Sequence, residues 1–345
     1  MTTVAKPKTR NQTFECFKLL ASVFVVFIHV KFPDRLGELM TCLARFAVPL
    51  FFAISGYYSY QTKSSRLAKR IVHILALNLL GSGIYLAWSV FSGFYLGNDV
   101  SELFWPKIYH IVRWILMGKD PYGGHLWFLP SLALAYGILW VYTRFYEDDS
   151  VNYRPLYTVS SLLMLVLLTC FELFPATEVS VPRVAFRNGF FFALPFLSLG
   201  IFLREHTERL FRAFCLTERK LLGIFLGALA FSVLEWYGIG NCEIYLGSMI
   251  AVPAVVLLCA GHPTISEGAL ASRILSRLGS VSTGVYLLHM VVREAYTPFV
   301  RWRIAGLLNH TEPYFEPIVV ALLSILASVL FVLCRDLAAG IVKKK

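Results

Sequence analysis

The chain has 345 residues, of which 57% are hydrophobic and only 15% are charged, against about 25% charged residues in an ordinary soluble domain. So large an apolar excess cannot be buried in one core beneath a polar surface, which excludes a nucleic-acid binder, a soluble Rossmann enzyme and a disulfide-rich secreted domain. The composition predicts an all-α polytopic membrane protein. In such a protein, the net charge of +11 is informative through the positions of the Lys and Arg residues along the chain.

Ten stretches are apolar over a length that crosses a bilayer, for which about 17 to 20 residues are needed. A first stretch that follows three basic residues can be a cleaved signal peptide, but no small-residue cleavage site follows it, so we expect it to stay as a helix. The stretches are approximately Phe14–Val30, Leu43–Tyr60, Ile71–Leu96, His125–Thr143, Pro155–Phe174, Asn188–Leu203, Leu221–Gly238, Glu243–Ala260, Val281–Val300 and Pro317–Leu337.

The basic residues predict which side each loop occupies. With the N-terminus inside, 20 of the 32 Lys and Arg residues fall in cytosolic segments and 9 in outer loops, while Lys18, Arg45 and Arg293 lie within apolar stretches. This excess favours an even number of spans with both termini in the cytosol of a cell-membrane protein. Residues 1–13 are then a cytosolic tail.

No soluble domain, low-complexity tract or clear repeat interrupts this pattern, so we expect one membrane-embedded domain over residues 1–345. The longest segment between spans is the outer loop 97–124, whose apolar residues recur at helical spacing and predict a helix in the plane of the interface. Such a helix is either a surface anchor or a cover over an outer site, with Trp105, Tyr109 and Trp114 offering faces to a sugar. The seven cysteines are scattered without a C-x-x-C pair and predict neither disulfides nor a metal site.

Ionisable residues within apolar helices are expensive and often functional. Lys18 and His29 are eleven residues apart in the first stretch, which places them on one helix face about 16 Å apart. They can mark the two ends of a cavity through the membrane. Alternatively, Lys18 reaches the lipid headgroups and His29 is an interfacial residue. Glu15 precedes Lys18 by three residues, so its carboxylate can neutralise the Lys18 charge.

Two further polar groups are expected at the outer side. Arg45 precedes a proline by four residues, so a fixed cation and a backbone break coincide near the depth of His29, unless Arg45 is only interfacial. His125 follows a Gly pair where the fourth stretch begins. His289 falls near the middle of the ninth stretch and is interpreted as a hydrogen-bonded core residue.

The third stretch is entered through a run of cations without an acid, which includes Lys69 and Arg70. Such a run commonly satisfies the positive-inside rule or contacts anionic membrane lipids, but clustered Lys and Arg also suit the phosphates of a cofactor. Sequence patterns of metallopeptidases, P-loop ATPases and serine hydrolases are absent from the chain.

In this order, the motifs resemble the integral-membrane acyltransferase 3 family over essentially the whole chain. Lys18 stands where many members have Arg, which keeps the charge but removes the bidentate fork. Each motif alone is weak, but five in register with ten helices are specific. They are Lys18 with ten intervening residues and His29, Arg45 with the following V-P-L-F-F and S-G-Y, Lys69-Arg70, His125-Leu-Trp-Phe-Leu, and Tyr286-Leu-Leu-His289.

The resemblance implies transfer of an acyl group from cytosolic acyl-CoA, usually acetyl-CoA, to a hydroxyl of a cell-surface glycan or a small molecule. His29 would be the essential base or a transient acyl carrier, Arg45 would stabilise the carbonyl oxygen, and His125 would orient His29 or the acceptor. Lys18, Lys69 and Arg70 would hold the cytosolic part of CoA.

The first two stretches are also similar to the membrane half of the vancomycin-resistance serine racemases. That resemblance implies a second possibility, a transporter of a small polar solute such as an amino acid. Transporters often carry inverted repeats and broken helices in matching halves, neither of which is clear in this sequence.

Overall fold

The computed structural model describes residues 10–97, 99–104, 108–146, 150–170, 186–301 and 312–342, and every regular element in them is helical. The fold class predicted from composition is confirmed in this respect. Parts of four predicted segments lie outside these residues: most of the tail 1–13, Trp105 with its neighbours in the loop 97–124, the end of Pro155–Phe174, and the C-terminal lysines.

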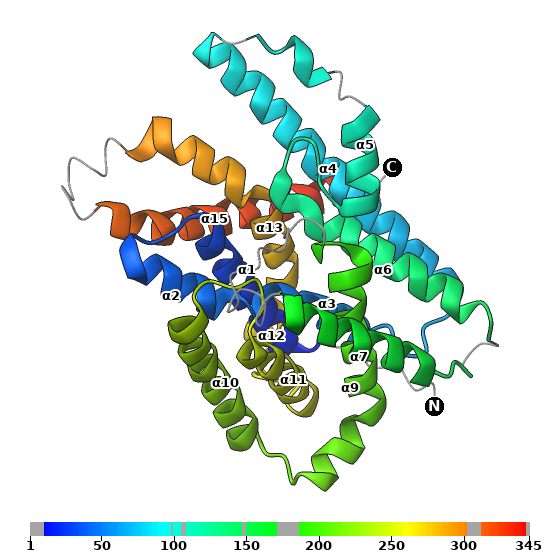
Figure 1. The fold of residues 1–345 in the computed structure, drawn as a ribbon. Coiled ribbons are helices and arrows are strands. Elements are labelled where there is room, and N and C mark those ends of the chain that lie inside the picture. The colour runs from blue at the N-terminus through cyan, green and yellow to red at the C-terminus, as the bar shows by residue number, and fades with distance from the viewer. Residues whose placement is uncertain are drawn as a thin grey trace.

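The described residues of the N-terminal half form seven α-helices and two short 3-10 helices (Figure 1). The α-helices are α1 (Gln12–His29), α2 (Asp34–Ala44), α3 (Ala47–Tyr57), α4 (Ser64–Leu96), α5 (Ile108–Met117), α6 (Phe128–Thr143) and α7 (Arg154–Leu168), and the 3-10 helices are η1 (Ser101–Phe104) and η2 (Gly124–Trp127).

The described residues of the C-terminal half include two π-helical segments, one that leads into α9 and one that follows α13. Its elements are η5 (Gly189–Ala193), α9 (Leu194–Ala213), α10 (Glu218–Ile239), α11 (Leu246–Gly261), α12 (Ala269–Leu275), α13 (Leu278–Tyr296), η6 (Thr297–Arg301) and α15 (Glu312–Val342).

Six helical segments in the described part of the chain are long and apolar enough to cross a membrane. They are Gln12–His29, Asp34–Tyr57, Ser64–Leu96, Gly124–Thr143, Glu218–Ile239 and Glu312–Ala338. The helices Arg154–Leu168 and Leu246–Gly261 are apolar but shorter, and the second half of α9 is rich in charged residues. The expected total of ten spans and the cytosolic location of the termini therefore stay predictions.

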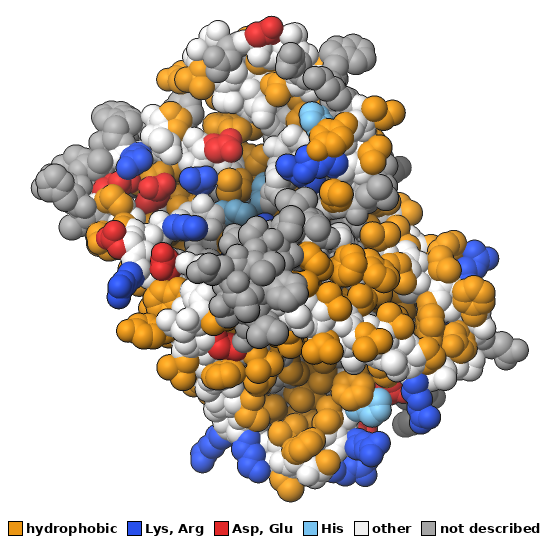
Figure 2. Space-filling model, viewed as in Figure 1, with side chains coloured by type: hydrophobic (Ala, Val, Ile, Leu, Met, Phe, Trp, Pro, Cys, Tyr) orange, Lys and Arg blue, Asp and Glu red, His pale blue; other side chains and the backbone are white. Residues whose placement is uncertain are grey.

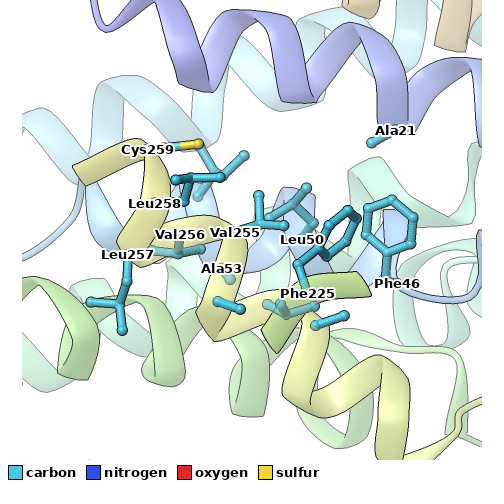
Figure 3. Packing of buried hydrophobic residues seen from close by; sticks show 14 of the residues in the cluster. Ala21, Phe46, Leu50, Ala53, Phe225, Val255, Val256, Leu257, Leu258 and Cys259 are labelled. Carbon is cyan, nitrogen blue, oxygen red and sulfur yellow. The ribbon is translucent and has the colours of Figure 1, made fainter. Parts of the chain in front are cut away.

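Buried apolar side chains hold α1, α3, α10 and α11 together in one cluster. In Figure 3, Phe46, Leu50 and Phe225 point toward one another between these helices. The ring centroids of Phe46 and Phe225 are 5.5 Å apart, in an edge-to-face arrangement. A second cluster joins α3, α6, α7 and α9, so α3 lies at the centre of the bundle.

The second predicted stretch, Leu43–Tyr60, begins too late, because α2 already starts at Asp34. Proline has no N–H, so Pro49 cannot donate to the carbonyl of Arg45, and the helix is interrupted there. Arg45 accordingly lies at the C-cap of α2, with Phe46 at the N-cap of α3. This interruption positions the Arg45 side chain near His29, the last residue of α1.

Candidate active site

Three histidines from distant parts of the sequence meet at one place. The ring centroid of His29 is 5.9 Å from that of His125 and 5.2 Å from that of His289, and the His125 and His289 centroids are 4.9 Å apart. His29 ends α1, His125 belongs to η2, and His289 lies in α13. Figure 2 shows histidine side chains within a hollow that has Lys and Arg side chains around it.

Packing of α1 against α13 explains why His29 and His289 are neighbours. Val26 and Val30 of α1 share a buried cluster with Val281 and Val285 of α13. Farther along α1, the hydroxyl of Ser282 donates to the carbonyl of Lys18 at 2.9 Å. The two helices therefore stay in contact over several turns.

A buried carboxylate organises the loop that carries His125. Asp120 Oδ1 accepts from the backbone N–H groups of Tyr122 and Gly123, at 2.9 and 3.0 Å, and its other oxygen accepts from the hydroxyl of Ser82. The hydroxyl of Tyr286 then donates to the carbonyl of His125 at 3.0 Å. Together these bonds fix the His125 backbone between α4 and α13.

His29 and His125 line a small cavity of about 60 Å³ together with Arg45, Arg187 and Glu243. It is called the outer cavity because the predicted topology places His29 at the outer side. The structure thus brings together the three residues predicted to take part in chemistry, His29, Arg45 and His125. Arg187 and Glu243 had no role in the sequence analysis, because charged residues are ordinary at the ends of predicted spans.

Glu243 forms ion pairs with two arginines. Arg187 binds it in a bidentate fork, with Nε to Oε2 at 2.9 Å and an Nη2 to Oε1 distance of 2.6 Å, while Arg45 Nη2 lies 3.5 Å from the same Oε1. The side chains of Arg45 and Glu243 are 9% and 5% exposed. Two cations around one carboxylate give the outer cavity a net positive charge.

The predicted inner site is a separate, larger cavity of about 580 Å³ whose lining includes Lys18, Arg70 and Arg10. A neighbouring cavity of about 1150 Å³ shares Lys18 and Arg10 and adds Arg204 and Arg335. Lys69 is exposed and does not line either of them.

Lys18 and Arg70 at this inner site bind to residues nearby in the sequence. Lys18 Nζ lies 2.7 Å from Oε1 of Glu15, so the Lys18 charge is largely balanced. Arg70 donates to the Ser59 hydroxyl at 2.7 Å and to the carbonyl of Tyr58 at 2.8 Å. Arg70 is therefore held rigidly at the cavity wall without a carboxylate among these partners.

The inner and outer cavities share two lining residues, Phe128 and Tyr286. Their ring centroids are 5.6 Å apart in an edge-to-face arrangement. Phe128 and Tyr286 thus form a wall that the basic inner cavity and the cavity of His29 have in common.

No group of three or more His, Cys, Asp or Glu side chains within the described ranges could hold a metal ion.

Comparison with known proteins gives a family model and one relative. The chain is 27% identical over 345 residues to a serine/alanine racemase of Enterococcus gallinarum, an alignment that covers 91% of this chain and 45% of the relative. The chain thus spans about half the length of that protein. No solved structure matches it. The family model described as "Acyltransferase domain" matches residues 11–334, nearly the whole chain, and the protein belongs to this acyltransferase 3 family.

Proposed function

We propose that this acyltransferase moves an acyl group, normally acetyl, from acyl-CoA at the inner cavity to a hydroxyl at the outer cavity. The acceptor is a hydroxyl of a cell-surface glycan or of a related small molecule, and the protein works in the cell membrane. The observation that carries this proposal is the shared wall, since Phe128 and Tyr286 border both the basic inner cavity and the cavity of His29.

The inner cavity suits the donor because its walls offer cations beside aromatic rings. Arg70 and Arg10 can bind phosphate oxygens, and Lys18, whose charge Glu15 largely balances, adds a third donor. Arg204 and Arg335 extend the positive surface into the adjoining cavity, whose volume leaves room for a nucleotide. Lys69, being exposed, can contribute only from the rim.

At the outer cavity, His29 accepts the proton of the attacking hydroxyl, which an imidazole does well near neutral pH. The hydroxyl oxygen bonds to the thioester carbon, the carbon–sulfur bond breaks, and His29 returns the proton to the departing thiolate. Arg45 stabilises the negative charge that develops on the carbonyl oxygen, and His125 orients the acceptor.

The test is CoA release by the purified protein in detergent, with acetyl-CoA and a panel of hydroxylated acceptors. His29→Ala should reduce the rate by at least about 100-fold, the usual contribution of a general base. His206→Ala is the matched control, because His206 packs on Phe202 at 4.4 Å and lines neither cavity. An unchanged rate in folded His29→Ala protein would refute the assignment.

A transport function has less support. The relative's name describes a racemase, which favours neither acyl transfer nor solute uptake for this chain. Solute uptake by reconstituted vesicles without any CoA would be the result that favours a transporter.

A further inference from the structure

His289 is fully buried in α13 and has a defined tautomer. Its Nδ1 lies 2.9 Å from the carbonyl oxygen of Tyr286 and 3.1 Å from that of Val285. A carbonyl oxygen only accepts, so Nδ1 must carry the proton, and in the neutral ring Nε2 then carries a lone pair.

The Nε2 atom of His289 is buried and has no hydrogen-bond partner among the described residues. An unsatisfied buried acceptor costs roughly 1–3 kcal/mol, so such an atom calls for an explanation. The nearest rings are those of His125 and His29, at centroid distances of 4.9 and 5.2 Å. Two imidazoles joined by an N–H···N bond of about 2.9 Å have centroids roughly 5 Å apart.

We propose that His289 is a positioning residue, whose Nε2 accepts a hydrogen bond from the N–H of His29 during turnover. The bond fixes the tautomer of His29, so that its other nitrogen presents a lone pair to the outer cavity. His289 does not line that cavity, so it acts on the reaction through His29 and does not contact the substrate. The proposal rests on the function proposed above.

His289 suits this role better than His125. The proton on His289 Nδ1 is fixed by two carbonyls of its own helix, whereas the ring of His125 has no such described bond that would define its tautomer. His125 also lines the outer cavity, which places it beside the acceptor. The two rings can therefore have different tasks.

Cations predominate around His29, so a neutral hydrogen-bond acceptor such as His289 adds no further positive charge beside it. Arg45, Arg187 and Glu243 share its cavity, with Tyr286 at the wall, and Arg293 follows His289 by one helical turn. The proton that His29 takes from the hydroxyl goes on to the thiolate, so His289 needs only to accept a hydrogen bond and keeps its own proton throughout.

Steady-state kinetics of CoA release provide the first test. His289→Ala should lower kcat by roughly 10- to 100-fold, as the loss of orienting partners commonly does, with KM for acetyl-CoA unchanged. His289→Gln, which keeps an acceptor oxygen near the position of Nε2, should recover most of that loss. Equal loss in both variants, or a change confined to KM, would overturn the proposal, and His206→Ala again serves as the control.

Nitrogen NMR of the intact wild-type protein labelled with [15N]histidine provides a test without turnover or substitution. The proposal expects His289 as the Nδ1–H tautomer, with the lone pair of Nε2 available to accept from His29. An Nε2–H tautomer at His289 would overturn it whether or not acyl transfer occurs. Failure of the wild type to release CoA with any acceptor would instead refute the proposed function, so the two failures are distinguishable.

Discussion

At the scale of single residues, the Glu243 carboxylate balances the charge of two neighbouring arginines and so stabilises the fold around them. Arg187 and Arg45 both face it, at 2.6 and 3.5 Å, and Arg45 is nearly buried. Breaking a buried ion pair by removing one partner leaves an uncompensated charge, which is typically costly. The three side chains therefore do not contribute equally to stability.

We predict that Glu243→Ala destabilises the protein by about 3–5 kcal/mol, because it leaves two cations side by side in a low-dielectric site. Arg187→Ala should cost about 1 kcal/mol or less, since Arg187 is one-third exposed and Glu243 keeps Arg45 as its partner. Unfolding in mixed detergent micelles measures both values.

Glu208→Ala is the control for this comparison. Glu208 is 92% exposed and lies 4.0 Å from Arg212, so its removal should leave stability unchanged. A larger loss for Arg187→Ala than for Glu243→Ala would contradict the electrostatic argument.

The sequence indicated His29, Arg45 and His125 because each is polar within or beside an apolar stretch. It did not indicate Arg187 and Glu243, which are 56 residues apart and sit at the ends of predicted spans. Nor did it show that His289, correctly interpreted as hydrogen-bonded and buried, faces His29. Periodicity defines the face of a helix, but only packing decides which face it meets.

At the scale of helices, α3 and α9 cross with their backbones in close contact. A Cβ on Gly200 would lie 1.9 Å from the carbonyl oxygen of Ala53, and a Cβ on Gly56 would lie 1.8 Å from that of Leu197. Small residues at such crossings allow backbones to approach closely in membrane proteins. This contact fixes α3, which follows directly from Arg45.

We predict that Gly200→Ala lowers the free energy of unfolding by about 1–3 kcal/mol, because the added methyl group overlaps backbone that cannot move alone. It should also reduce CoA release by displacing α3 and, with it, Arg45. Thermal unfolding in detergent and the CoA assay measure the two effects.

Gly227→Ala in α10 is a matched control, since a Cβ there has no atom within 4 Å. Its stability should be equal to or slightly above that of the wild type, owing to the higher helix propensity of Ala. If both glycine variants behaved alike, the close crossing would not be what stabilises this pair of helices.

Hydropathy placed a helix in each of the ten stretches but set several boundaries wrongly. It missed α2, whose residues Asp34–Ala44 are too mixed in polarity to resemble a span. It also ended the sixth stretch at Leu203, although α9 continues to Ala213 through charged residues. Helix ends governed by caps, prolines and tertiary contacts are not encoded in apolar run length.

At the scale of the whole molecule, the topology predicted from the basic residues places the two cavities toward opposite sides of the bilayer. The loop between α9 and α10 belongs to the predicted cytosolic side, and Cys215 within it is exposed. Lys31 is exposed between α1 and α2, near the end of the helix that carries His29. These two positions can report on orientation.

We predict that a membrane-impermeant maleimide modifies Cys215 in inverted vesicles but not in intact cells, because basic loops stay in the cytosol. Lys31→Cys, in a background with Cys215→Ser and Cys334→Ser, should show the reverse pattern. Mass spectrometry of the labelled protein measures both. Modification of Cys215 in intact cells would reverse the proposed direction of transfer.

The aromatic pair of Phe128 and Tyr286 also matters for the ion gradients across the cell membrane. A water-filled passage from Arg70 to His29 would let protons and ions leak down their gradients and discharge the membrane potential. In the proposed function, the two packed rings at the wall shared by the cavities would keep the bilayer electrically sealed while an uncharged acyl group passes from one cavity to the other.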